Sequence, residues 1–320
     1  MSAPGAGIGI VSNPQSGHNR DRFGTLRRQL DACPGAIHRV TAGPAAIGDV
    51  LDEFAAAGID LLVINGGDGT AAAVLGELLE RPRFARQPAI ALLPAGTANM
   101  NAGDVGVAGS LRAAARRLTA WARGSRREAQ RVVRPLLRVT VDDGATPHYG
   151  MFLGAGAVVH GTEYAHRALH ARGLRDDFSL LLGTLRTAWG VARRDPAFTR
   201  PLRIGVALDG REFGDFDALI LALSTLERLA FGMRPFWGER AGPLRLTLIE
   251  QHPRYFLPTF ASILRGRPGR HARPRAGYHS HAGQGLALTL SGDVNLDGEL
   301  LAVDRGLAIV ASAPLVFLRP

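Results

Sequence analysis

The chain has 320 residues and a mass of 34.0 kDa, which is enough for about two domains with buried cores. It contains no lysine, so all 38 cationic side chains are arginine, and with 28 acidic residues the formal net charge is +10. The absence of lysine excludes a Walker-type phosphate loop and any lysine Schiff base. A phosphate group could be held here only by backbone N–H groups, hydroxyls, amides, arginine or a metal ion.

The rest of the composition is that of a folded protein in a reducing compartment. Hydrophobic residues make up 46% and charged residues 21%, which excludes a disordered chain. The single cysteine, Cys33, excludes an intrachain disulfide and a cysteine zinc site. The N-terminal segment lacks the basic start of a signal peptide, and no apolar run is long enough to span a membrane. We therefore expect a cytoplasmic protein whose arginines give it peripheral contact with anionic membranes.

Short apolar runs alternate with helical patterns over residues 1–130. Strands are predicted at Gly7–Val11, Ile37–Thr41, Leu61–Asn65 and Ile90–Leu93, with helical spacing of apolar residues between them. Alternation of this kind predicts a doubly wound parallel sheet with right-handed crossovers. In such sheets ligands bind beyond the carboxyl ends of the strands. Residues 1–130 are therefore predicted to form an α/β nucleotide-binding domain.

The pattern becomes rich in strands over residues 131–320. Strands are predicted at Leu136–Val141, Tyr149–Leu153, Leu202–Leu208, Ala218–Leu223, Leu244–Ile249, Leu286–Leu290 and Leu307–Ala311. Turn signals follow at Asp143-Gly144, Asp209-Gly210 and Asp297-Gly298. We expect a mostly antiparallel β-sandwich domain, interrupted by a helical insertion at about 162–194.

The segment Gly66-Gly67-Asp68-Gly69-Thr70 carries the most information about chemistry. It follows a buried strand and opens an alanine-rich helix, whose N-terminal amides and dipole favour a phosphate. Glycines without a Cβ let the backbone approach phosphate oxygens closely, and Asp68 could hold a Mg²⁺ ion that bridges them. The structural alternative is a tight turn with an Asp or Thr helix cap. Three glycines around one acid exceed what a cap requires, so a phosphate site is the favoured interpretation.

Two further turns end strands of the same predicted sheet. Asn13-Pro14-Gln15-Ser16-Gly17 follows the first strand and Pro94-Ala95-Gly96-Thr97-Ala98-Asn99 follows the fourth. Either one alone is an ordinary turn. The parallel arrangement puts both on the edge that carries Gly66–Thr70, which favours one shared site.

These three motifs, in this order and spacing, resemble the diacylglycerol kinase catalytic domain family, which includes bacterial lipid kinases and the sphingosine kinases. The similarity extends to Asp297-Gly298-Glu299 and so covers nearly the whole chain. It implies a two-domain fold like that of NAD kinases and diacylglycerol kinases, with ATP and Mg²⁺ as cofactors and the nucleotide bound in the cleft between the domains. The Gly-Gly-Asp-Gly element alone also occurs in NAD kinases and phosphofructokinases.

The resemblance implies roles for individual residues. The nucleotide-binding positions it implies are Asn13, Ser16, Gly17, Thr41, Gly66, Gly67, Asp68, Gly69, Thr70, Thr97 and Asn99, with Asp68 next to the metal. Asp297 and Glu299 match the acidic pair that supplies the general base, and Glu299 is the preferred base with Asp297 orienting it or binding metal. The alternative for Asp297 is a plain hairpin turn, since Asp-Gly turns are also predicted at Asp143-Gly144 and Asp209-Gly210. One departure from the family pattern is Met100, where many members have an aspartate.

Two weaker signals concern histidines and arginines. Glu163, His166 and His170 share a helical face, but a solvated helix is favoured there over a metal site. The segment 251–292 contains six arginines and no acid, and arginines are also dense over 112–138. An anionic membrane fits this surface better than nucleic acid, because aromatic residues are not interleaved with the arginines. Association into a homodimer is left open.

Together these observations predict an ATP-dependent lipid kinase that transfers the γ-phosphoryl group to a lipid hydroxyl. One alternative is a kinase of a soluble substrate, such as an NAD kinase. A second is a nucleotide-binding sensor without catalytic activity, and a third is an arginine-rich RNA-binding protein. The lipid is not identified by any motif in the second domain.

Overall fold

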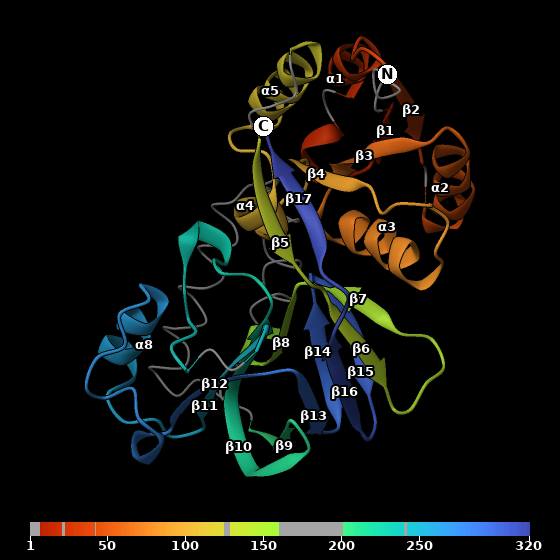
Figure 1. Cartoon of the computed structure of the whole chain (residues 1–320). Helices are drawn as coiled ribbons and strands as arrows, with labels where there is room; N and C mark the ends of the chain where they lie inside the picture. Colours follow the sequence, from red (N-terminus) through yellow and green to blue (C-terminus); the bar gives the residue numbers. More distant parts are fainter. Residues whose placement is uncertain (1–6, 21–22, 42, 125–128, 160–200, 240–241) are drawn as a thin grey trace. The chain divides into compact units, whose positions relative to one another are not determined.

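The computed structural model describes residues 7–20, 23–41, 43–124, 129–159, 201–239 and 242–320 (Figure 1). The chain divides into two compact units, Met1–Arg134 with Ala313–Pro320, and Pro135–Ser312. The predicted helical insertion at 162–194, which includes Glu163, His166 and His170, lies outside the described residues. Among the residues that are described, no helix is long and apolar enough to cross a membrane.

The first unit contains a six-stranded sheet in the order β2-β1-β3-β4-β17-β5. Its strands are β1 (Gly7–Ser12), β2 (Ala36–Val40), β3 (Ile59–Gly66), β4 (Ala89–Pro94), β5 (Gln130–Arg134) and β17 (Leu315–Arg319). The first four run parallel, β17 runs parallel to β4, and β5 closes the edge antiparallel to β17. The apolar runs read from the sequence are the buried interiors of these strands.

Helices cover both faces of this sheet. They are α1 (Phe23–Asp31), α2 (Ile47–Ala56), α3 (Asp68–Glu80), α4 (Met100–Val105) and α5 (Leu111–Arg123). On one face, apolar residues of α1 and α5 pack with Ile8 and Ile10 of β1. On the other, the Phe54 ring of α2 lies against Gly9, where an added Cβ would be 2.5 Å from the ring. Because alternate residues of a strand point to opposite faces, the sheet is doubly wound, as predicted.

The second unit contains an eleven-stranded sheet in which every pairing of the described strands is antiparallel. Its strands are β6 (Leu137–Val141), β7 (His148–Gly150), β8 (Phe152–Gly156), β9 (Leu202–Leu208), β10 (Arg211–Ser224), β11 (Leu244–Glu250), β12 (Tyr278–Gly283), β13 (Gly285–Thr289), β14 (Gly292–Leu296), β15 (Glu299–Val303) and β16 (Gly306–Ala311). The long β10 pairs with β9 along its first half and with β8 and β11 along its second half. The helix α8 (Phe256–Leu264) packs on this unit. The predicted combination of a parallel first domain and an antiparallel, β-rich second domain is confirmed.

The boundaries of the two units differ from the predicted domain ranges, which were 1–130 and 131–320. The first unit extends to Arg134, and the segment Ala313–Pro320 returns to it. The physical reason is the pairing of β17, which inserts between β4 and β5 and completes the first sheet. Both ends of the second unit therefore connect to the same side of the first sheet, through β5 and β17.

Candidate functional site

Three loops meet at the carboxyl edge of the parallel sheet. They follow β1, β3 and β4, and the ends of these strands are in register, with Ser12 opposite Asn65 and Gly66 opposite Pro94. The backbone N–H of Asn13 donates to the carbonyl of Asn65 at 3.0 Å. The predicted edge therefore exists, and the three motifs lie side by side along it.

Side-chain hydrogen bonds join the first loop to the second. The Asn13 amide donates to the Thr70 hydroxyl at 3.0 Å, and the Gly67 N–H donates to the Ser16 hydroxyl at 3.1 Å. The Ser16 and Thr70 hydroxyl oxygens are 3.4 Å apart. Three of the predicted nucleotide-binding side chains thus form one cluster around the N-terminus of α3. The first N–H groups of α3 have no partner within the helix, so this end of the helix favours a negative charge.

Glycines allow the third loop to pack against the other two. An added Cβ at Gly96 would lie 2.6 Å from the Cα of Gly67, and one at Gly17 would lie 2.7 Å from the Thr97 hydroxyl. Both distances are far shorter than ordinary carbon contacts. The His18 N–H also donates to the Ala95 carbonyl at 2.9 Å. The glycines predicted to admit phosphate therefore have a packing role as well, because they set how closely the loops approach.

Asn99 and Thr97 differ in what their side chains do. Asn99 has a left-handed backbone, with φ +47, and its amide bonds both the N–H and the C=O of Gly96 at 2.7 Å. Its side chain therefore shapes the loop after β4. Thr97 is exposed and so is accessible to a ligand. The predicted role of Asn99 in nucleotide binding stays a prediction, beside its structural role in holding the loop.

Asp68 lies at the start of α3 and has a structural contact that the sequence analysis missed. Its carboxylate accepts the N–H groups of Met100 and Asn101, at 3.1 and 3.0 Å, and so caps the N-terminus of α4. Burial raises the pKa of this carboxyl, and the two N–H bonds offset the rise only in part. No local signal could have revealed this contact, because the donors lie 32 and 33 positions away in the chain.

The Asp68 carboxylate fits a magnesium site in which the protein supplies a single ligand. Each of its oxygens keeps a lone pair beyond the N–H bond it accepts. Across the described parts of the chain, no group of three or more His, Cys, Asp or Glu side chains could form a protein-built metal cage. Magnesium bound through one or two carboxylates together with substrate phosphates and water needs no such cage. The single carboxylate therefore suits Mg²⁺ that arrives with a nucleotide.

A row of hydrogen-bonded polar side chains lies at the strand ends that carry these loops. The sequence analysis did not predict it. The Asn65 amide donates to the Ser12 hydroxyl at 2.9 Å, and that hydroxyl lies 2.7 Å from Nε2 of His38. Nδ1 of His38 lies 2.5 Å from the Asp31 carboxylate. Because the Asp31 carboxylate only accepts, His38 donates from Nδ1. Burial lowers the pKa of His38, which favours the neutral ring that accepts from Ser12 at Nε2. The signal in the sequence was that polar residues, Ser12 and Asn65, terminate apolar strands.

Thr41 lies on the same edge, directly after β2. Its N–H donates to the carbonyl of Ser12 at 2.9 Å, and its side chain is buried. The contact places Thr41 beside the first loop, in agreement with the predicted neighbourhood. Its buried hydroxyl is less accessible to a ligand than that of Thr97.

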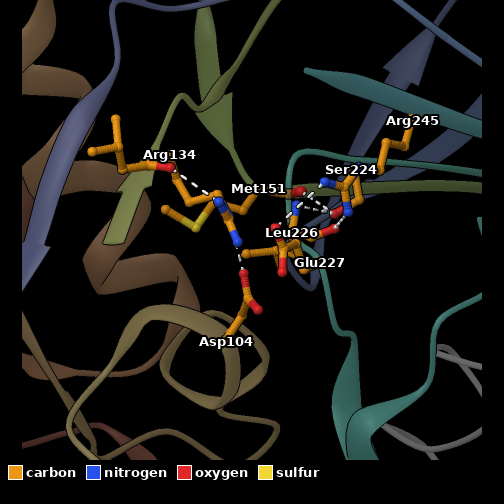
Figure 2. A network of polar contacts seen from close by, with 8 residues as sticks. Asp104, Arg134, Met151, Ser224, Leu226, Glu227 and Arg245 are labelled. Atoms are coloured by element: carbon orange, nitrogen blue, oxygen red, sulfur yellow. Dashed lines mark hydrogen bonds and ion pairs between the residues drawn. The ribbon is translucent and has the colours of Figure 1, made fainter. Parts of the chain in front are cut away.

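Two buried polar contacts, one in each unit, are drawn in Figure 2. In the first unit, the Arg134 guanidinium of β5 pairs with Asp104 of α4 at 3.2 Å. Asp104 is the first acid after Met100, and this pairing ties α4 to the sheet edge. In the second unit, the Ser224 hydroxyl donates to the Met151 carbonyl at 2.6 Å and accepts the N–H of Leu226 at 3.0 Å.

Asp297 and Glu299 lie in the second unit, at the turn between β14 and β15. Asp297 has a left-handed backbone, and its nearly buried carboxylate accepts the N–H groups of Met151 and Phe152, both at 2.9 Å. Glu299 is exposed on β15, and within the described residues its carboxylate has no hydrogen bond or ion pair. The two acids are thus close in the chain, but only Glu299 presents a carboxylate that is open to a ligand.

The other two Asp-containing turns work in the same way. Asp209 has a left-handed backbone, and its carboxylate accepts the N–H groups of Gln284 and Gly285, at 2.7 and 2.8 Å. Asp142, also left-handed, accepts three N–H groups from residues 304–306. Each aspartate thus fixes its own turn to a distant one. The contacts of Asp297 are those of such a turn, so they do not by themselves mark it as catalytic.

Comparison with known proteins agrees with the motifs. Residues 8–130 match the sequence model of the diacylglycerol kinase catalytic domain, so the predicted resemblance to this family is confirmed. The match supports a kinase-type phosphotransferase, and the family that it describes implies the use of ATP. A search of curated protein sequences finds no match.

Solved structures support the fold over the whole chain. A diacylglycerol kinase from Bacillus anthracis is 16% identical with a TM-score of 0.60, and covers 97% of this chain and 96% of its own. Another B. anthracis protein assigned as a diacylglycerol kinase is 15% identical with a TM-score of 0.68, over 99% and 97% of the two chains. Yeast NADH kinase in complex with NADH is 12% identical with a TM-score of 0.51, over 99% and 84%. At these identities the likeness shows the fold alone.

Proposed function

We propose that this protein is an ATP-dependent lipid kinase, which transfers the γ-phosphoryl group of ATP to a lipid hydroxyl. The observation that carries the proposal is the loop cluster at the N-terminus of α3, where Ser16, Thr70 and the amide of Asn13 surround unpaired helix N–H groups. Such a cluster binds phosphate without lysine. The family match over residues 8–130 supports a kinase, and the lipid acceptor is our inference from the family resemblance.

In this proposal the residues of the first unit hold the nucleotide. The glycines bring backbone N–H groups close to the phosphates, and the hydroxyls of Ser16, Thr70 and Thr97 donate to phosphate oxygens. Mg²⁺ held by Asp68 and the phosphates would supply charge neutralisation on the transferred group.

The acceptor is activated by Glu299 in this proposal, and Asp297 positions the turn that carries it. A general base must have an oxygen that is free to accept a hydroxyl proton. Asp297 is only 9% exposed and each of its oxygens already accepts an N–H group, so its remaining lone pairs are shielded from an incoming hydroxyl. The Glu299 carboxylate is exposed and accepts no hydrogen bond from the described residues.

The test is a phosphoryl-transfer assay on the full-length protein with radiolabelled ATP and Mg²⁺. One reaction contains a total lipid extract in detergent micelles, and a parallel reaction contains NAD. Label in a lipid supports the proposal, and label in NADP would assign the alternative, a soluble-substrate kinase. Binding of ATP without transfer to either acceptor would identify a nucleotide-binding protein without catalysis.

A pair of variants tests the acidic turn. Glu299→Gln is exposed and keeps the size of the side chain, so we expect normal folding by circular dichroism and a loss of turnover of about 10²–10⁴-fold. The matched control is Asp293→Asn, an exposed acid on the neighbouring strand β14, which should keep full activity. Full activity in Glu299→Gln would remove this residue from the mechanism.

A further inference from the structure

We infer that α8 and the arginine-rich segment after it form a docking surface for an anionic phospholipid membrane. This α8 surface consists of exposed Tyr255, Leu257 and Pro258 with the six arginines of residues 251–292. The inference rests on the proposed function for its biological role, because a lipid kinase has to reach a hydroxyl at an interface. The exposure of the apolar side chains and the charge of the arginines support the surface independently of that function.

The helix α8 has one buried and one exposed apolar side. Its inner side chains, Phe256, Phe260 and Ile263, pack against a core that includes Tyr278 of β12. The rings of Phe256 and Phe260 stack at 5.1 Å, which fixes how the helix sits on the sheet. No residue of α8 is charged. Its outer side is therefore not the polar face that a surface helix of a globular protein usually presents to water.

The apolar residues on the outer side are well exposed. Tyr255 is 61% exposed and Leu257 is 47% exposed, and Pro258 beside them is exposed as well. The loop that carries Phe231, 51% exposed, is tied to the other end of α8 by the N–H of Arg234, which donates to the Leu264 carbonyl at 2.9 Å. An apolar helix side with aromatic residues at its ends is typical of helices that lie in a membrane interface.

The arginines beside this helix have no acidic partners. The six are Arg254, Arg265, Arg267, Arg270, Arg273 and Arg275, and all are exposed. Within the described residues none of them forms an ion pair, whereas Arg39, Arg83 and Arg134 each pair with a carboxylate. Residues 251–292 contain no Asp or Glu. An excess of cations around an apolar helix complements the negative surface of anionic lipids.

The charge and the exposed apolar residues of the α8 surface favour a membrane over a second copy of the chain or a nucleic acid. A second copy of the chain would bring two sets of the same unpaired arginines together, which is unfavourable. Nucleic acid would complement the charge, but phosphate contacts would leave Leu257 and Pro258 without a partner. A bilayer provides both negative headgroups and an apolar layer for these residues.

The test measures sedimentation of the full-length protein with vesicles, in the absence of ATP. Vesicles of phosphatidylcholine with an equal part of phosphatidylglycerol are compared with pure phosphatidylcholine, at low and at high salt. We expect binding to the anionic vesicles that weakens with salt. Absence of binding at low salt would overturn the inference. Because no phosphoryl transfer is measured, this result is separate from the lipid kinase assay, where detergent micelles replace the membrane.

Arginine substitutions test whether the vesicles bind at the α8 surface. Removing one cation should weaken binding about fivefold, the equivalent of about 1 kcal/mol. The triple change Arg265→Gln, Arg267→Gln and Arg270→Gln should therefore weaken it about a hundredfold. The matched control is Arg112→Gln, Arg116→Gln and Arg123→Gln on α5, which removes the same number of exposed arginines and should leave binding close to that of the wild type. Equal losses in both triples would overturn the inference, since attraction by net charge alone would explain them.

A third variant separates the apolar contribution. Leu257→Ser changes an exposed residue, so the fold should persist by circular dichroism, and binding to anionic vesicles should fall several-fold with the charge unchanged. Binding to an RNA homopolymer that is tighter than binding to vesicles would assign the surface to nucleic acid. A dimer in analytical ultracentrifugation that Leu257→Ser converts to monomer would assign it to a second copy. Either outcome would overturn the inference.

Discussion

Replacing Gly96 with alanine should push two of the three loops apart. The added Cβ would lie 2.6 Å from the Cα of Gly67, whereas carbon atoms in contact prefer about 3.5–4.0 Å. The loops therefore have to separate by about 1 Å. Gly96 cannot adjust alone, because its N–H and C=O are both bonded to the Asn99 amide at 2.7 Å.

The expected cost of Gly96→Ala follows from overpacking of a close backbone contact, which is about 1–3 kcal/mol of unfolding free energy. In a domain of this size each kcal/mol lowers the melting temperature by about 2–4 °C. If the three loops bind the phosphates together, a shift of this size should also reduce turnover by about a hundredfold. Thermal unfolding measures the first effect, and the phosphoryl-transfer assay with radiolabelled ATP measures the second.

Gly69→Ala is the matched control within the same set of motifs. No atom lies within 4 Å of a Cβ at Gly69, and the residue is exposed in the first turn of α3. Its stability should stay the same or rise by about 0.4–1 kcal/mol, since alanine restricts the unfolded chain. Equal melting temperatures for the two variants would show that Gly96 and Gly67 are not in close contact, and the reasoning from packing would fail.

Two further predictions concern buried polar groups. Asp297→Asn replaces one acceptor oxygen with an amide that faces the N–H groups of Met151 and Phe152, so the free energy of unfolding should fall by about 1–3 kcal/mol in a urea titration. Unchanged stability would mean that these hydrogen bonds do not hold the turn. Burial lowers the pKa of His38 below 6.5, so the unfolded state takes up a proton at a higher pH than the folded state. The contribution of His38 to stability is therefore complete above pH 6.5 and is lost as the pH falls through the folded pKa, and His38→Gln should reduce this pH dependence. An equal slope in the wild type and His38→Gln, measured by unfolding at several pH values, would contradict the neutral ring.

The parallel half of the first sheet was predictable because its signals are local. Each strand is an apolar run that ends in a cluster of turn residues, and all four predicted strands lie within a residue or two of those observed. The edge that they form followed from the rule that parallel strands present their carboxyl ends together. The contacts of Ser16, Thr70 and Gly67 needed only this rule to be anticipated as a cluster.

Of the strands that were missed, β14 and β15 form a hairpin around the predicted turn at Asp297-Gly298, whereas β5, β12 and β17 depend on distant partners or have an unusual composition. β5 lies in an arginine-rich stretch that resembled a connector, and β17 joins the first sheet only by pairing with β4 and β5. β12 has the sequence Tyr-His-Ser-His-Ala-Gly, which lacks the branched residues typical of strands. Its position is set by pairing with β11, and a single sequence does not contain that information.

The same limit explains why the sequence did not reveal the structural contacts of two acids. Asp68 and Asp297 were selected because they occur in motifs with glycine, and each binds a pair of N–H groups from a segment far along the chain. A buried carboxylate needs such donors, since an unpaired charge would be expensive to bury. Holding the loops and binding a ligand are not exclusive for Asp68, because its oxygens keep lone pairs and the helix that it caps starts from the loop after β4. Asp297 also keeps lone pairs, but its carboxylate is nearly buried, and this supports the predicted preference for the exposed Glu299 as the proton acceptor. The absence of lysine fits the proposed function, in which the N–H groups, hydroxyls and one carboxylate of the loop cluster hold Mg²⁺ and a phosphate without a cationic side chain.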